Sequence, residues 1–131
     1  MAELFSAEWM HAFMTAWNRD AGLSVELARV GFSSTIAYGF DVEEHPRVVF
    51  VIEGGKITSA SSYGGQTLNW DLRASREQWL AWKAKPPSLM GLGLAYTQRK
   101  LRFKAGDYSA MVKDPRLAAP FVRSFELLAG V

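Results

Sequence analysis

The first part of the chain follows the spacing of an amphipathic helix. Between Phe5 and Asp20 apolar residues recur at helical intervals and polar residues occupy the opposite side; the apolar ones are Trp9, Met10, Phe13, Met14 and Trp17. Ser6 suits the N-cap, because its hydroxyl can accept a hydrogen bond from a free N–H of the first turn. The pattern predicts one long helix. Residues 24–29 are either a second, short helix or an irregular lead into a sheet.

The period then changes to two, which is typical of β-strands. Between Phe32 and Val42 large apolar side chains alternate with small or polar ones, and a continuous β-branched and aromatic run follows from Val48 to Ile52. Lys56 to Tyr63 and Leu68 to Arg73 continue the alternation, and a Gly-Gly pair precedes each of these two segments. These segments predict four strands of an antiparallel meander, in which the second strand is central and buried on both faces.

Helical spacing returns in the second half. Ser75 precedes a helix that contains Trp79 and Trp82, and residues 89–95 form another despite two glycines, each of which costs about 1 kcal/mol relative to Ala. Residues 101–105 alternate as a fifth strand, a short helix follows, and Asp114 caps the last helix. We therefore expect an α+β fold, with a five-stranded, mainly antiparallel sheet covered on one face by helices, as a single domain over residues 1–131.

The composition excludes several kinds of site. The chain has no Cys, which rules out disulfides, thiol nucleophiles and Cys-ligated metals, and its 2 His residues, His11 and His45, are too few for a multi-histidine metal centre. His11 has no acid partner that the sequence can place, and His45 lies in a turn beside Glu43 and Glu44, which favour its charged form. Both are expected to be surface residues, and no glycine-rich phosphate loop occurs. We expect no metal, no cofactor and no catalytic residues.

Targeting signals are also missing from the sequence. The first residues are acidic and lack the basic region of a secretory signal, and the last residues lack the Ser-Lys-Leu peroxisomal address. The longest uncharged stretch, residues 57–70, is shorter than the roughly 20 apolar residues of a membrane span. These features predict a soluble, cytoplasmic protein.

Charge is distributed unevenly along the chain. Residues 1–66 carry 8 acids and 4 bases, whereas residues 67–131 carry 5 acids and 11 bases. Six of these bases gather near aromatic residues in the sequence: Lys83, Lys85, Arg99, Lys100, Arg102 and Lys104. They form either a solvated face or a surface for transient contact with an anionic membrane, where each base contributes about 1 kcal/mol. Nucleic-acid binding is not expected, because Phe103 points away from Arg102 and Lys104.

Three segments together resemble the sterol-carrier-protein domain family (sterol carrier protein type 2). They are the strand 48–52 followed by Gly54-Gly55-Lys56, the segment Asn69-Trp70-Asp71-Leu72-Arg73-Ala74-Ser75 before Trp79, and Leu101-Arg102-Phe103-Lys104-Ala105-Gly106-Asp107. The family often has a glycine before its last strand, where this chain has Arg99-Lys100. The resemblance implies an apolar tunnel that binds fatty acids, acyl-CoA or sterol-like lipids noncovalently for intracellular transfer or presentation. It implies no catalytic residues.

The composition is consistent with such a ligand. The chain contains 8 Phe, 5 Trp, 4 Tyr and 5 Met, and apolar ligand pockets are lined mainly by residues of this kind. With the last helix as a lid, the predicted ligand-binding residues are Phe13, Trp17, Trp79, Trp82, Met90, Leu94, Phe103, Met111, Phe121 and Phe125. Tyr38, Asp71 and Tyr108 are candidates for polar residues that reach the cavity.

Two other functions stay open. One is a small cone-shaped α+β enzyme similar to ketosteroid isomerases and dehydratases, in which an apolar pocket holds an Asp, His or Tyr. Such folds devote their second half to long strands, whereas the second half of this chain is mainly helical. The other is a protein-interaction module whose aromatic face binds a partner protein or a second copy of the chain as a homodimer.

Overall fold

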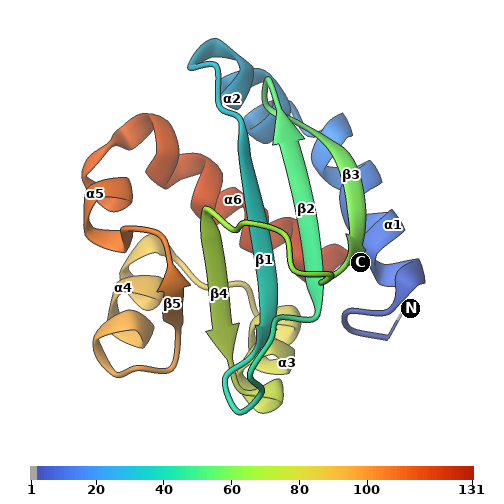
Figure 1. Ribbon diagram of the computed structural model, residues 1–131. Helices are drawn as coiled ribbons and strands as arrows, with labels where there is room; N and C mark the ends of the chain where they lie inside the picture. Colours follow the sequence, from blue (N-terminus) through green and yellow to red (C-terminus); the bar gives the residue numbers. More distant parts are fainter. Residues whose placement is uncertain (1–2) are drawn as a thin grey trace.

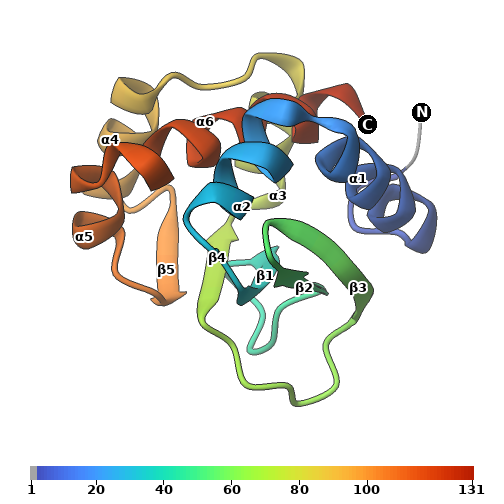
Figure 2. The ribbon, with the colours of Figure 1, turned by 90° about the horizontal axis from the view of Figure 1, so that it is seen from above.

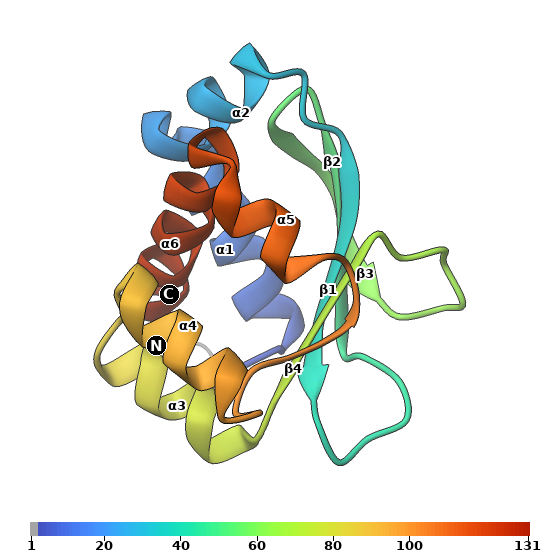
Figure 3. The same cartoon turned by 90° about the vertical axis from the view of Figure 1, so that its left-hand side faces the viewer.

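A computed structural model describes residues 3–131 (Figure 1). Across these residues the chain forms six α-helices, a π-helical turn and a five-stranded sheet. The helices are α1 (Ala7–Arg19), the π-helical turn η1 (Ala21–Val25), α2 (Glu26–Arg29), α3 (Arg76–Ala84), α4 (Leu89–Thr97), α5 (Tyr108–Lys113) and α6 (Pro115–Gly130). The strands are β1 (Ser34–Phe40), β2 (Val48–Glu53), β3 (Lys56–Ser62), β4 (Trp70–Ala74) and β5 (Arg102–Ala105). The predicted α+β class and the helical covering of one sheet face are confirmed (Figure 3).

The helix starts follow the capping rules used above. The N-caps predicted at Ser6, Ser75 and Asp114 are confirmed, since each side chain accepts a hydrogen bond from a backbone N–H in the first turn of α1, α3 and α6. Residues 24–29, for which the sequence left two alternatives, are helical as the end of η1 and the whole of α2.

The strand order β3-β2-β1-β4-β5 corrects the predicted meander. The first three strands do pair antiparallel in succession, with β2 internal. β4, however, lies parallel to β1 on its other side, and β5 returns antiparallel to β4. The sheet is therefore mixed, and β1 is its central strand.

At the edge of β3 where β4 was expected, α1 binds part of the strand, which is consistent with this order. The side-chain amide of Asn18 donates to the carbonyl of Ile57 (2.9 Å) and accepts from its backbone N–H (2.8 Å). The chain after β3 crosses to the far side of β1 instead (Figure 2), where Asn69 exchanges two hydrogen bonds with the backbone of Thr35 (2.9 and 3.0 Å). Strand periodicity alone does not distinguish this crossover from a hairpin.

The connections 41–47 and 63–69 lie along the sheet face opposite to the helices (Figure 3). On this face Arg73, which is 1% exposed, forms a two-bond ion pair with Asp71 (2.6 and 3.0 Å). Its remaining N–H groups donate to the carbonyls of Phe40, Glu43 and Glu44. Arg73 thereby fastens the 41–47 connection to the sheet.

Most of the aromatic residues form a dense core between α1, α3, α6 and the sheet. Trp9 stacks on Phe13 with ring centroids 5.1 Å apart, and Phe13 packs against Phe50 of β2 at 5.2 Å. Trp79 and Phe125 bring α3 and α6 onto the same cluster, at 6.1 Å. A large part of the aromatic excess therefore holds the fold together.

Candidate ligand-binding cavity

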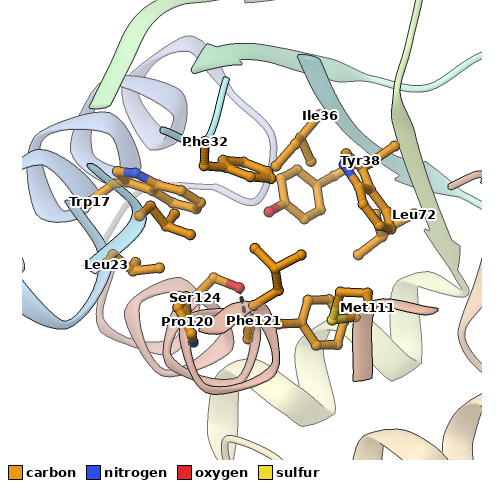
Figure 4. Close-up of a pocket in the computed structure, with 13 residues that line it drawn as sticks. Trp17, Leu23, Phe32, Ile36, Tyr38, Leu72, Met111, Pro120, Phe121 and Ser124 are labelled. Atoms are coloured by element: carbon orange, nitrogen blue, oxygen red, sulfur yellow. Dashed lines mark hydrogen bonds between the residues drawn. The ribbon is translucent and has the colours of Figure 1, made fainter. Parts of the chain in front are cut away.

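An apolar cavity lies between the helix-covered face of the sheet and helix α6 (Figure 4). It is lined by residues from α1, η1, α2, β1, β4, α5 and α6 and by Phe32, which lies between α2 and β1: Trp17, Leu23, Leu27, Phe32, Ile36, Tyr38, Trp70, Leu72, Met111, Leu117, Pro120, Phe121 and Ser124. None of these thirteen residues carries a charged side chain. The cavity thus offers mainly hydrocarbon and aromatic surface to anything inside it.

The periodicity of the strands and of α6 brings these residues together. Ile36 on β1 pairs with Trp70 on β4, and Tyr38 pairs with Leu72, so that all four side chains lie on the same sheet face. Residues 117, 121 and 124 are three or four positions apart on α6 and share the side that faces the sheet. The parallel pairing of β1 with β4 is therefore what forms the floor of the cavity.

The ring of Trp70 reaches the cavity because residue 106 has no side chain. Gly106 has a φ of 101° and lies so close to this ring that a Cβ atom would overlap its carbon atoms. Gly106 therefore has two roles: it adopts the positive φ of the turn after β5, and it leaves room for the Trp70 ring at the cavity.

The cavity is small in this structure. Its free volume is about 60 Å³, room for a few water molecules. Sites for small organic ligands commonly measure roughly 300–1,000 Å³. Because the lining combines side chains from the sheet and from several separate helices, a ligand of that size could enter only if these side chains moved apart.

Comparison with known proteins places this arrangement among solved folds. No family model and no curated protein sequence matches the chain. A crystal structure of sterol carrier protein 2 superposes with a TM-score of 0.75 at 17% identity, covering 98% of this chain and 99% of that one. The chain has the sterol-carrier-protein fold. The resemblance inferred from the three sequence segments is thus confirmed for the fold.

Two further structures share the sterol-carrier-protein fold. The solution structure of a conserved hypothetical protein from Thermus thermophilus, described as possibly a sterol carrier protein, superposes with a TM-score of 0.59 at 19% identity, covering 98% of this chain and 86% of that one. A structure described as UbiJ-SCP2, a ubiquinone synthesis protein, superposes with a TM-score of 0.61 at 10% identity, covering 98% and 93%. Identities this low establish a common fold and leave the ligand to be argued from the residues.

Three of the predicted ligand-binding residues line the cavity in this sterol-carrier-protein fold: Trp17, Met111 and Phe121. Phe103 borders it, since its ring packs against both Trp70 and Phe121 at 6.1 Å. Four others belong to the neighbouring aromatic core and lie outside the lining: Phe13, Trp79, Trp82 and Phe125. Contact of any of these residues with a ligand stays a prediction.

Met90 and Leu94 lie on the outer side of α4, away from the cavity, and are 85% and 58% exposed. The reason is that α4 is apolar on all sides, so its sequence does not indicate which face turns inward. Leu92 and Ala95 face inward instead. The structure thus corrects the predicted placement of Met90 and Leu94 in the lining of the cavity.

The lining residues that sequence reasoning missed come mainly from the strands, η1, α2 and the start of α6. They are Leu23, Leu27, Phe32, Ile36, Trp70, Leu72, Leu117, Pro120 and Ser124. The period-two alternation of β1 and β4 carried a signal for three of them, Ile36, Trp70 and Leu72. Using it required the knowledge that β4 lies beside β1.

Of the three polar candidates, only Tyr38 reaches the cavity. Asp71 alternates with the lining residues Trp70 and Leu72, so it points to the opposite sheet face, where it is paired with Arg73. Tyr108 is stacked on Tyr96 of α4 at 4.1 Å, and its hydroxyl approaches Gly93, where a Cβ atom would lie 3.3 Å away. Gly93 thus permits α4 and α5 to pack closely.

The six clustered bases surround the region of α4 along the chain. Lys85, Arg99, Lys100, Arg102 and Lys104 are exposed, and Lys83 is partly buried. Among the helices of residues 3–131, none combines the length and apolar character that a membrane span requires. Within the same residues no group of three His, Cys, Asp or Glu side chains is arranged to hold a metal ion.

Proposed function

We propose that this protein binds a hydrophobic ligand noncovalently in the cavity between β1, β4 and α6, and transfers it or presents it to another protein. The observation that carries the proposal is an uncharged, mainly apolar cavity at the centre of a sterol-carrier-protein fold. Burial of a lipid there contributes about 25 cal/mol for each Å² of apolar surface removed from water. Such binding needs no catalytic group.

The ligand class is broad. Fatty acids, acyl-CoA and sterol-like lipids are proposed on the resemblance of the sequence, and the neighbour described as a ubiquinone synthesis protein adds ubiquinone to the ligands worth testing. Since shape and burial select ligands less sharply than paired polar groups do, we expect several of these to bind.

Native mass spectrometry of the freshly purified protein, followed by organic extraction, tests the proposal. The expected result is a bound species of acyl, sterol or quinone mass, or a mass increase when palmitate, a sterol or ubiquinone is added. A protein that stays free of ligand in every one of these conditions would contradict the proposal.

An enzymatic function has less support. The lining contains no carboxyl or imidazole group, and the phenol of Tyr38 is its one candidate for an acid–base group among the thirteen residues. A protein-interaction module based on an aromatic face also has less support, because Trp9, Trp17, Trp79 and Trp82 are buried.

A contact with an anionic membrane is the second part of the proposal. On α4 three apolar side chains stand out into solvent: Leu89 at 42% exposure, Met90 at 85% and Leu94 at 58%. Exposed bases precede α4 at Lys85 and follow it at Arg99 and Lys100. Apolar side chains that enter the headgroup region, flanked by bases that attract anionic lipid, are the usual means of interfacial binding.

Co-sedimentation with vesicles tests this contact. We expect the protein to bind vesicles of phosphatidylcholine and phosphatidylserine more strongly than phosphatidylcholine alone, and less strongly at high salt. The double variant Met90→Ser, Leu94→Ser should lose about tenfold or more in binding, given about 1.5–3 kcal/mol for full burial of one such side chain. Val42→Ser is a matched control, because Val42 is 90% exposed in the 41–47 connection. Equal binding of the wild type and the double variant would remove α4 from the contact.

A further inference from the structure

One polar group points into the cavity without a partner. Tyr38 is 3% exposed, and Figure 4 shows its hydroxyl directed into the cavity between β1 and α6. The structure describes no hydrogen bond from this hydroxyl to any of residues 3–131. Buried hydroxyls are normally paired, because an unpaired one costs about 1–3 kcal/mol. The hydroxyl of Tyr38 is therefore a free hydrogen-bonding group at the place where a ligand would lie.

The position of this hydroxyl is fixed by the core. The Tyr38 ring makes edge-to-face contacts with Phe13, Phe50 and Trp79, with centroids 6.0, 5.9 and 5.9 Å apart. These three rings belong to the dense aromatic cluster behind the cavity. Since the ring cannot turn away without disturbing that cluster, the hydroxyl is preorganised toward the cavity, at its sheet side.

Of the three other polar side-chain groups of the lining, those of Trp17, Trp70 and Ser124, two are already engaged within the protein. The indole N–H of Trp17 donates to the carbonyl of Gly55 (2.9 Å), and the hydroxyl of Ser124 donates to the carbonyl of Phe121 (2.6 Å). Both bonds are satisfied within the protein, so neither donor is free for a ligand. Tyr38 differs from them in this respect.

The charge of the lining limits what Tyr38 can bind. None of the thirteen lining side chains is charged, so a carboxylate or phosphate beside Tyr38 would lose its hydration without gaining a counterion. Burial raises the pKa of the Tyr38 phenol, since no nearby cation stabilises the phenolate. The phenol therefore stays protonated at neutral pH and can donate.

We propose that the hydroxyl of Tyr38 donates a hydrogen bond to a neutral oxygen of the bound ligand, such as an ester, ketone or quinone carbonyl or an alcohol. The cavity thereby selects uncharged amphiphiles whose oxygen is buried, over lipids that would place a carboxylate at the same point. This inference rests on the proposed function and narrows its ligand class. A fatty acid binds under this scheme only with its carboxylate outside the cavity.

A set of ligands with the same chain length isolates this hydrogen bond. Hexadecan-2-one and methyl palmitate carry a neutral carbonyl, palmitate carries a charge, and hexadecane carries neither. Displacement of the neutral dye N-phenyl-1-naphthylamine gives their relative affinities for the wild type, for Tyr38→Phe and for Tyr63→Phe. Tyr63→Phe is the control, because Tyr63 stacks on His45 outside the cavity, at 5.3 Å.

The expected loss of affinity depends on the hydroxyl group of Tyr38 alone. Tyr38→Phe keeps the ring and its packing, so the variant should fold and bind hexadecane with nearly the wild-type affinity. Its affinity for the ketone and the methyl ester should fall about five- to tenfold, the usual effect of one neutral hydrogen bond. Tyr63→Phe should change none of these affinities.

Three outcomes contradict the inference in distinguishable ways. If Tyr38→Phe binds the ketone as tightly as the wild type does, Tyr38 makes no bond to the ligand, and the proposed function stands. If palmitate binds more tightly than its methyl ester and also weakens in Tyr38→Phe, the selection for neutral ligands is wrong. If the wild type binds none of the four ligands, the inference and the proposed function fail together.

Discussion

A single substitution on α6, Ser124→Leu, should fill the cavity. Ser124 is 5% exposed, lines the cavity, and lies across it from Tyr38 (Figure 4). Its hydroxyl bonds only within α6, and leucine is a good helix former, so the helix should persist. Because the leucine side chain occupies the space that a ligand would enter, we expect this variant to lose ligand binding.

The effect on stability can be worked out from the cavity. At about 24 cal/mol per Å³, a cavity of about 60 Å³ corresponds to about 1.4 kcal/mol that filling recovers at most. Against this gain, leucine excludes from the cavity the few water molecules that it can hold and that can hydrate the hydroxyl of Tyr38, which costs about 1–3 kcal/mol. The free energy of unfolding of Ser124→Leu should therefore lie between about 0.4 kcal/mol above and about 1.6 kcal/mol below that of the wild type.

Adding Tyr38→Phe removes the hydroxyl and with it the penalty. The double variant should be about 1 kcal/mol more stable than the wild type, which raises Tm by about 4 °C. Tyr38→Phe alone leaves the cavity open, so the cycle should give a favourable coupling free energy of about 1–3 kcal/mol between the two sites. The sign of this coupling depends on the hydroxyl facing the cavity.

Urea unfolding, followed by tryptophan fluorescence, measures the four free energies, and dye displacement measures binding. Ser109→Leu, on an exposed position of α5, is the control for adding a leucine to this part of the molecule. Wild-type ligand affinity in Ser124→Leu would mean that the ligand lies elsewhere. A coupling below about 0.5 kcal/mol, the usual limit of additivity, would mean that the hydroxyl does not face residue 124.

Two further predictions concern the ion pairs. Arg73→Met should lower the free energy of unfolding by about 3–5 kcal/mol, because it leaves the buried carboxylate of Asp71 unpaired. The double variant Asp71→Leu, Arg73→Met should recover most of this loss. Urea unfolding of both variants tests the prediction, and equal stabilities of the single and the double variant would contradict it. Arg123 bonds Asp20 at 2.5 and 2.9 Å and lowers the pKa of that carboxyl, so the pair stabilises the fold above the ordinary carboxyl pKa and loses this effect as the pH falls through the lowered value. Because Arg123 is 41% exposed, Arg123→Gln should destabilise by up to about 1 kcal/mol at neutral pH and by nothing measurable near about pH 2, in thermal melts across this range. A difference that persists unchanged into acid would contradict the assignment.

The elements of this fold could be predicted from local signals, and the strand order could not. Caps at Ser6, Ser75 and Asp114 and the period-two strands all depend on residues close together in the sequence. The position of β4 involves contacts between distant residues, since β4 pairs with β1 and Asn18 of α1 binds the backbone of Ile57, 39 positions away, at the edge of β3 where β4 was expected to pair. No periodicity records such a contact.

The candidate site was harder to predict than the fold for a related reason. Side-chain size identifies residues that are buried, but it does not separate Trp79, which lies in the core, from Trp70, which lies at the cavity. What separates them is the parallel pairing of β1 with β4 and the missing side chain at Gly106. Both are properties of the assembled sheet.

The division between core and cavity indicates where the molecule can open. α6 is held by Phe125, which packs against Trp79 and Trp82 at 6.1 and 5.3 Å, so moving the whole helix would disrupt the core. α5 has 6 residues, too few to be stable as an isolated helix, and it contributes Met111 to the cavity. Displacing α5 therefore costs less than displacing α6.

Since Tyr108 of α5 stacks on Tyr96 of α4, the helix with the exposed apolar side chains also contacts α5, the more easily displaced of these two parts of the cavity wall. The membrane contact proposed for α4 would thus act next to this part of the cavity wall, which is a route of entry for the proposed ligand that displacing α5 could open.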